Sequence, residues 1–249
     1  MNVSECLERR GEYRRSILLR SFPDRVEGEL EDNVHHFQAT IWHDGKKVLR
    51  AEGKGIRFPY STCGGGAAQV SALEGMDLTE DLRAPYQHTN VREQCTHTFQ
   101  LAAHAVTHAK RGEPRRLYEM FIQERLDGTS LAVLRESDRP LLSWELRDEL
   151  LLTPVEFAGL TPTQVAEKVF STGYEEGEMA TMLRRAVGQS LAQRRVTHLQ
   201  TPFAAGLSTS GVCYTFQPAR AVQAASLDSI RNFENGDVWP LRERTGRGD

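Results

Sequence analysis

The chain has 249 residues, of which 39% are hydrophobic and 26% are charged, and its formal net charge is −3. This composition is typical of a globular protein that buries a substantial core. The weakly negative charge gives no general attraction to nucleic acid or to an anionic membrane, so we expect neither as a partner.

No apolar run approaches the roughly 20 residues that span a bilayer, and the residues before Tyr13 lack the apolar core of an export signal. The four cysteines lie far apart and form no CxxC pair. We therefore expect free thiols and a cytoplasmic location.

A short apolar run, two alternating segments and a hairpin signal predict a first antiparallel meander of three or four strands. The expected strands are Ser16–Arg20, Val26–Leu30, His36–Trp42 and Lys46–Phe58. The turn residues Asp44 and Gly45 favour a hairpin before the last strand. Asp32 lies in another expected turn, directly before the strand that begins at His36.

Pro59 ends this meander and is followed by a loop, Tyr60–Gly66, and an expected helix over Ala67–Leu73. Three consecutive glycines before a helix form either an anion-binding nest or merely a flexible helix entry. They are not a P-loop, because no Gly-Lys-Ser/Thr follows. Residues 77–88 are polar and are expected to be irregular.

The segment Glu93–Ala109 is predicted to form one long helix. At about 100° per residue, a small and apolar face gathers Cys95, Phe99, Ala102 and Val106. Three histidines gather on the opposite face: His97, His104 and His108. The unpaired N–H groups of the first turn carry partial positive charge, and they lie beside Cys95 and His97.

The next part of the chain follows a similar pattern. A second meander is expected over Leu117–Leu126, Thr129–Arg135 and Pro140–Leu152, and helices are expected over Thr161–Phe170 and Glu178–Gln193. Pro154 corresponds to Pro59, and Asp127 corresponds to Asp32, at an offset of about 95 residues in each case. Either the halves, about 13–110 and 115–195, are duplicates within one domain, or two meanders merely look alike.

The remainder is predicted to contain a loop over Thr201–Gly211, a closing strand over Gly211–Gln217 and a helix over Ala221–Arg231, which make a C-terminal element at 211–232. A disordered tail is expected over 242–249. The expected fold class is therefore α+β: two pseudo-repeated antiparallel meanders, each followed by helices and packed as a single domain over residues 1–249.

Several separated elements occur in order within about residues 13–109: Tyr13 with Arg15, Leu30–Asp32, His36, Pro59–Cys63 and Cys95–His97. Their order resembles a bacterial family of unknown function whose members share a Cys-Thr-His motif at a helix start. Two positions depart from the pattern: Gln94 replaces a glycine, and Gly64 replaces a proline. The resemblance implies the positions of a site and no particular reaction.

For the site we expect His97 as a general acid/base, because the ordinary pKa of histidine lies near neutrality. Asp32 or His36 from the meander is the expected orienting partner. Cys95 is either an activated thiol or a buried apolar residue, and it meets His97 only if it lies before the first helical turn. The expected substrate-binding residues are Arg15, Tyr60 and Glu93.

His104 and His108 have the i, i+4 spacing of two metal ligands, but the HExxH motif is absent, and we expect a solvated histidine stripe. We therefore expect no metal and no cofactor. The predicted function is cofactor-free acid/base chemistry on a small molecule, as a lyase or isomerase, in a pocket between the first meander and the helix. The alternative is a non-catalytic small-molecule binder, and a homo-oligomer is compatible with either.

Overall fold

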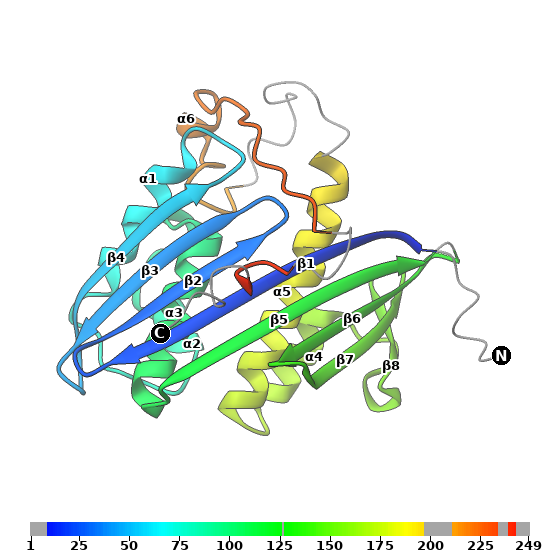
Figure 1. Ribbon diagram of the computed structural model, residues 1–249, viewed down its shortest axis with the longest axis horizontal. Coiled ribbons are helices and arrows are strands. Elements are labelled where there is room, and N and C mark those ends of the chain that lie inside the picture. The colour runs from blue at the N-terminus through cyan, green and yellow to red at the C-terminus, as the bar shows by residue number, and fades with distance from the viewer. Residues whose placement is uncertain (1–8, 126, 197–210, 234–238, 243–249) are drawn as a thin grey trace. The chain divides into compact units, whose positions relative to one another are not determined.

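A computed structural model describes residues 9–125, 127–196, 211–233 and 239–242. The fold class is α+β, and the strands form one antiparallel sheet in the order β4-β3-β2-β1-β5-β6-β7-β8 (Figure 1). The chain divides into two compact units. The first-meander unit comprises 17–117 and the described part of 196–231, and the second-meander unit comprises the described parts of 1–16, 118–195 and 232–249.

The first meander has four strands, within the three or four that the sequence predicted. They are β1 (Arg9–Phe22), β2 (Arg25–Asp32), β3 (His36–His43) and β4 (Val48–Arg57). Gly45, at φ +85°, lies in the turn between β3 and β4, where a left-handed residue is needed. In the β2–β3 pair, Glu31 lies opposite His36 and Leu30 lies opposite Phe37.

The core of the first-meander unit lies between β2, β3 and the helix α3 (Thr96–Arg111). Leu30, Phe37 and Phe99 are buried there. A Cβ at Gly28 would lie 2.9 Å from the Leu101 side chain, so glycine at this position lets the helix approach the sheet closely.

Helix α3 begins three residues later than Glu93, the expected first residue. Cys95 is its extended N-cap residue, and Gly112 ends it in the left-handed conformation at φ +70°. The expectation of a solvated histidine stripe is wrong, because His104 and His108 are fully buried. The face of α3 that carries these histidines is therefore buried as well as its apolar face. A single apolar stripe in the sequence predicts only one buried face.

Short helices connect β4 to α3. They are α1 (Cys63–Ala67), η2 (Ala68–Leu73), α2 (Arg83–His88) and η3 (Val91–Glu93). The three glycines therefore lie inside α1, not in a flexible entry before the helix. A Cβ at Gly65 or Gly66 would lie 2.9 Å from Tyr214, so these glycines make room for an aromatic ring. Helix α2 also corrects the expectation that residues 77–88 are irregular.

The second meander has four strands, whereas three were expected. They are β5 (Arg115–Arg125), β6 (Thr129–Glu136), β7 (Arg139–Arg147) and β8 (Leu150–Thr153). The expected strand Pro140–Leu152 is divided by a tight turn at Asp148 and Glu149, which have φ values of 51° and 65°. Such turns favour Asn or Gly, so these two acidic residues gave no hairpin signal.

Helices follow the second meander as predicted. They are η4 (Val155–Phe157), α4 (Pro162–Phe170) and α5 (Tyr174–Val196). Thr161 caps α4 in a capping box with Gln164. Elsewhere in this unit the buried Glu119 accepts two hydrogen bonds from Arg242 and one from Arg135.

The predictions for the C-terminal part are wrong where the structure describes it. Gly211–Gln217 forms turns, not a strand, because Gln217 and backbone groups bond within the segment and to residues before α3. The expected helix over Ala221–Arg231 is reduced to α6 (Pro218–Ala221). Most of the predicted loop Thr201–Gly211 and of the tail 242–249 lies outside the described residues. In the described chain, no helix is long and apolar enough to cross a membrane.

The proposed match of Asp32 with Asp127 is wrong. Asp32 ends β2 and begins the second turn of its meander, whereas Asp127 lies in the turn between β5 and β6, the first turn of the other meander. Counting the second meander as three strands had placed its β5–β6 turn opposite the β2–β3 turn of the first. Pro59 and Pro154, in contrast, both follow the last strand of a meander.

Candidate functional site

The turn between β2 and β3 is built around Asp32. Its Oδ1 accepts hydrogen bonds from the backbone N–H groups of Val34 and His35, both at 2.8 Å. The Asp32 N–H in turn donates to the His35 carbonyl at 2.8 Å. Aspartate favours such a turn because its short carboxylate reaches the backbone two and three residues further on. The carboxylate is completely buried.

Arg57, at the end of β4, holds this turn from the neighbouring edge of the sheet. Its guanidinium donates to the carbonyl oxygens of Asp32 at 2.7 Å, Asn33 at 3.2 Å and His35 at 3.3 Å. It also bonds Glu31 at 3.2 Å and the carbonyl of Ser229 at 2.5 Å. The rigid fork of arginine suits several acceptors in one plane, so Arg57 fixes the shape of the turn.

Two histidine rings stack beside Asp32. His35 Nδ1 lies 3.0 Å from Asp32 Oδ1, and the His35 ring faces the His97 ring with centroids 3.7 Å apart and planes at 21°. His97 comes from the first turn of α3 and is half-buried, whereas His35 is 6% exposed. Phe37 lies near both rings, with its centroid 6.0 Å from that of His97. The result is a buried carboxylate, a buried imidazole and a more accessible imidazole in one cluster.

His35 is the residue of this cluster that sequence reasoning missed. The structure brings the expected residues Asp32 and His97 together through it. The spacing Asp-x-x-His across a turn, with its aspartate ending a strand, was the available signal. A turn of this length brings the aspartate and histidine side chains close together.

His36, the expected partner, does not join this cluster. Neighbouring residues on a strand point to opposite faces of the sheet, and Phe37 faces the core. His36 Nε2 instead lies 2.6 Å from Glu29 Oε1, and its Nδ1 lies 3.8 Å from Glu31. This second imidazole–carboxylate group is also buried.

Cys95 is buried and packs with Phe37 and Ala67. Burial raises the pKa of its thiol, and hydrogen bonds from Thr98 and from the His97 backbone oppose that rise only in part. Cys95 does lie before the first helical turn, as a reactive pair with His97 would require. Its neutral thiol nevertheless fits the apolar interpretation better.

The expected substrate-binding residues lie in three different surroundings. Arg15 is buried, with its guanidinium 5.7 Å from the Tyr13 ring centre. Tyr60 is half-buried edge-on to Phe216, and burial raises the pKa of its hydroxyl. Glu93 forms an ion pair with Arg220 at 2.7 Å. The structure places none of the three among the Asp32, His35 and His97 side chains.

The expected absence of a metal was argued from His104 and His108 alone, and the structure changes that argument. His104 faces Gln100, and His108 Nδ1 lies 3.5 Å from a Glu113 oxygen. Among the described residues, the group whose ligand-type atoms converge is instead Asp32, His35 and His97, with all three atoms within 4.8 Å of one another.

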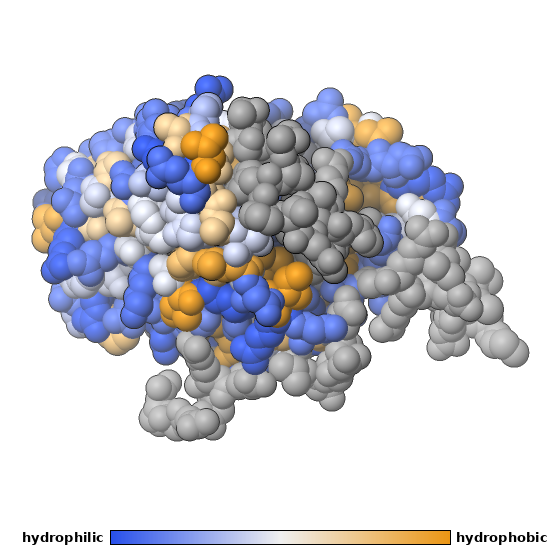
Figure 2. Space-filling view, turned by 90° about the horizontal axis from the view of Figure 1, so that it is seen from above, coloured by the Kyte–Doolittle hydropathy of each residue, from blue (hydrophilic) through white to orange (hydrophobic). Residues whose placement is uncertain are grey.

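A surface groove of about 630 Å³ runs along β3, β4 and η2 and includes Arg50, Glu52, Lys54 and Glu74 in its lining. It takes no residue from the histidine cluster. Figure 2 shows mostly hydrophilic residues with smaller hydrophobic areas between them, on the side of the molecule where Figure 1 places α1 and α6. Val222, at 81% exposure, is an exposed hydrophobic residue that follows α6.

Comparison of the chain with protein-family models and with curated proteins finds no match to either. The functional argument therefore rests on the geometry of the cluster.

Proposed function

We propose that this protein is a small-molecule enzyme that uses cofactor-free acid/base chemistry, as a lyase or an isomerase. The observation that carries the proposal is the cluster in which buried Asp32 holds His35 and His35 stacks on the more accessible His97. In this proposal His97 exchanges a proton with the substrate, and Asp32 and His35 are positioning residues behind it.

The roles follow from burial and hydrogen bonding. With its Nδ1–H directed at Asp32, His35 has a fixed ring orientation, and the stacked His97 ring takes its orientation from His35. A general acid/base must touch the substrate, and His97 is the least buried of the three side chains. His36 keeps its own carboxylate partner and has no role in this scheme.

The reaction class follows from which groups lie beside His97. Phe37 stacks near the His97 ring and belongs to an apolar cluster with Cys95 and Ala67, against which Phe58 and Cys63 pack. No Ser-His-Asp arrangement was found in the sequence, and a thiol with a raised pKa is a poor nucleophile. Proton transfer without a covalent intermediate, as in a lyase or isomerase, is therefore favoured over hydrolysis through a covalent intermediate.

The test begins with a thermal-shift screen of metabolites, because a ligand that binds the folded chain raises its melting temperature. Conversion of each hit is then followed by NMR in the wild type, His97→Gln and Cys95→Ala. We expect His97→Gln to lose roughly 10²–10⁴ in rate with folding intact. We expect Cys95→Ala to remain active and to lose on the order of 1 kcal/mol of stability.

Three results would change this conclusion. Hits that bind but are never converted would favour the alternative, a non-catalytic binding protein on the same scaffold. An active His97→Gln enzyme would remove His97 from the chemistry. Substrate-protected inactivation of the wild type by iodoacetamide, together with an inactive Cys95→Ala, would make Cys95 the nucleophile.

We further propose membership of the bacterial family with the Cys-Thr-His motif, supported by the position of Cys95–His97 at the start of α3. An internal duplication is also proposed, because each half runs through four strands and then helices. A cytoplasmic location and a homo-oligomer remain predictions.

A further inference from the structure

We propose that Asp32, His35 and His97 also form a binding site for one divalent transition-metal ion, of which Zn²⁺ is the example tested below. We further infer that the ion inhibits the acid/base reaction. The inhibitory part rests on the proposed function, whereas the binding part stands independently of it.

The first argument is convergence of three ligand atoms. Each side chain offers one atom, and the three lie within 4.8 Å of one another. Atoms at the corners of such a triangle lie at most about 2.8 Å from its centre, and Zn²⁺ bonds nitrogen and oxygen at about 2.0–2.2 Å. Movements of less than about 1 Å would therefore bring all three atoms to bonding distance.

The second argument is that the frame of the site is already built. Asp32 and His35 lie on one turn, whose backbone is fixed by the Asp32 Oδ1 bonds and by Arg57. Groups that orient ligands in this way are a regular part of metal sites. The third ligand, His97, comes from the first turn of α3 and is the least buried of the three; because its ring is stacked nearly parallel on His35, coordination also requires the ring to turn toward the ion.

The donor set indicates the class of ion. Two imidazoles and a carboxylate suit Zn²⁺, Fe²⁺ or Co²⁺, whereas Mg²⁺ and Ca²⁺ take mainly oxygen ligands. No thiolate belongs to the group, so a soft ion such as Cu⁺ is not favoured. Three protein ligands leave a coordination position for water.

Metal binding has a direct consequence for the proposed chemistry. An ion bound by His97 occupies the nitrogen lone pair with which this ring would accept a substrate proton. The metal-loaded protein is therefore an inhibited form, and removal of the ion restores the reaction.

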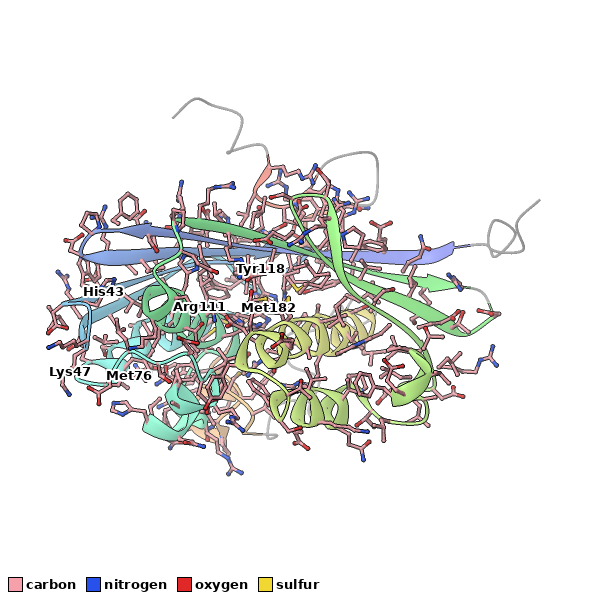
Figure 3. The ribbon with its side chains drawn as sticks, turned by 90° about the horizontal axis from the view of Figure 1, so that it is seen from below. His43, Lys47, Met76, Arg111, Tyr118 and Met182 are labelled. Carbon is pink, nitrogen blue, oxygen red and sulfur yellow. The ribbon has the colours of Figure 1, made fainter. Side chains whose placement is uncertain are left out.

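The test uses the full chain after treatment with a chelator and removal of that chelator. Zn²⁺ is titrated by calorimetry, Co²⁺ by its visible spectrum, and Mg²⁺ serves as the oxygen-preferring comparison. The three ligand variants are Asp32→Asn, His35→Gln and His97→Gln. The matched control is His43→Gln, a half-buried histidine at the other end of β3, in the region where Figure 3 shows His43, Lys47 and Met76. His104→Gln tests the i, i+4 pair.

We expect about one Zn²⁺ or Co²⁺ per wild-type chain, with no comparable binding of Mg²⁺. Each ligand variant should weaken Zn²⁺ binding by roughly tenfold or more, while His43→Gln and His104→Gln retain it. Circular dichroism checks that each variant is folded, and His97→Gln, at the least buried position, keeps the test decisive if Asp32→Asn does not fold. The site would be overturned by a wild type that binds no ion. It would also be overturned if folded His35→Gln and His97→Gln bound Zn²⁺ with the affinity of the wild type.

Activity measurements separate this inference from the proposed function. Binding with inhibition supports both. Binding with an active enzyme that requires the ion would preserve the site and overturn both the inhibition and the cofactor-free reaction. No binding, in an enzyme that still depends on His97, would overturn the metal site and leave the proposed function in place.

Discussion

Replacement of Arg57 by alanine tests whether one side chain holds the turn that carries Asp32 and His35. Arg57 donates to four backbone carbonyls and to Glu31, from a side chain that is only 21% exposed. Loss of a hydrogen bond costs about 1 kcal/mol, and somewhat more when one partner is charged. Water can replace some of these donors at the exposed edge, so we expect a loss of about 2–4 kcal/mol in the free energy of unfolding.

The measurement is thermal and urea unfolding of the wild type, Arg57→Ala, Arg57→Lys and Arg50→Ala. A chain of this size loses roughly 2–4 °C per kcal/mol, so Arg57→Ala should lower the melting temperature by about 5–15 °C. The melting temperature of Arg57→Lys should lie between those of the wild type and Arg57→Ala, because lysine keeps the charge but not the planar guanidinium. Arg50, on the same strand and 61% exposed, is the control and should change stability by less than about 1 kcal/mol.

The turn itself provides the second readout. If Arg57 orients it, the ring N–H signal of His35, which reports its bond to Asp32, should shift or broaden in NMR spectra of Arg57→Ala and stay in place in Arg50→Ala. An Arg57→Ala protein with the stability of the Arg50 control, or with an unchanged His35 signal, would refute the reasoning.

Two further predictions concern close packing and buried thiols. Gly53→Ala would place a Cβ 2.1 Å from the Ala67 carbonyl oxygen and should cost about 1–3 kcal/mol by urea unfolding. Gly64→Ala meets only Phe58, at 3.6 Å, and lies in α1, so it should be neutral or slightly stabilising; equal effects of the two variants would contradict the packing argument. Burial raises the pKa of the Cys63 thiol from 9.0 to about 12. Above pH 9 the unfolded chain therefore loses this proton before the folded chain does. The free energy of unfolding should consequently fall between pH 9 and 12. Cys63→Ala should make that fall shallower, and an unchanged slope would show that Cys63 is not protected.

The strands of the first meander were predictable from two signals. Strand β3 alternates between buried and less buried residues, as a strand with one buried face does, whereas β1 is buried without alternation over Tyr13–Leu19 and was found from its apolar run. The β7–β8 turn was not predictable, because its two left-handed residues are Asp148 and Glu149. Their conformation is imposed by the pairing of the strands on either side. A single missed turn then produced the false match of Asp32 with Asp127.

The helix shows a different limit of sequence reasoning. Its length and its Cys95–Phe99 face follow from periodicity, but periodicity cannot reveal a second cover over the face that carries His104 and His108. The burial of those histidines depends on segments distant in sequence. For the same reason i, i+4 spacing could not indicate that the converging ligand-type atoms are those of Asp32, His35 and His97.

The cluster was only partly predictable. Asp32 and His97 were selected from local signals, a turn and a helix start, and the structure brings them together. His35 was missed because the side-chain direction of a turn residue depends on the exact register of the turn. Here the register is set by the pairing of Glu31 with His36 and by the bonds of Asp32 Oδ1.

The second meander offers a comparison for why the histidine cluster forms at one turn and not at the other. Its second turn, between β6 and β7, also contains an aspartate, Asp138, but that carboxylate is largely exposed and pairs with Arg242. Ser137 and Asp138 both have positive φ, so this turn is a tight two-residue connection with no room for an intervening histidine. In the longer Asp32–His35 turn, the Asp32 carboxylate is buried and the His35 imidazole lies within hydrogen-bond distance of it. The β2–β3 connection is one residue longer than the β6–β7 connection, and this difference, not the aspartate alone, allows the cluster to form.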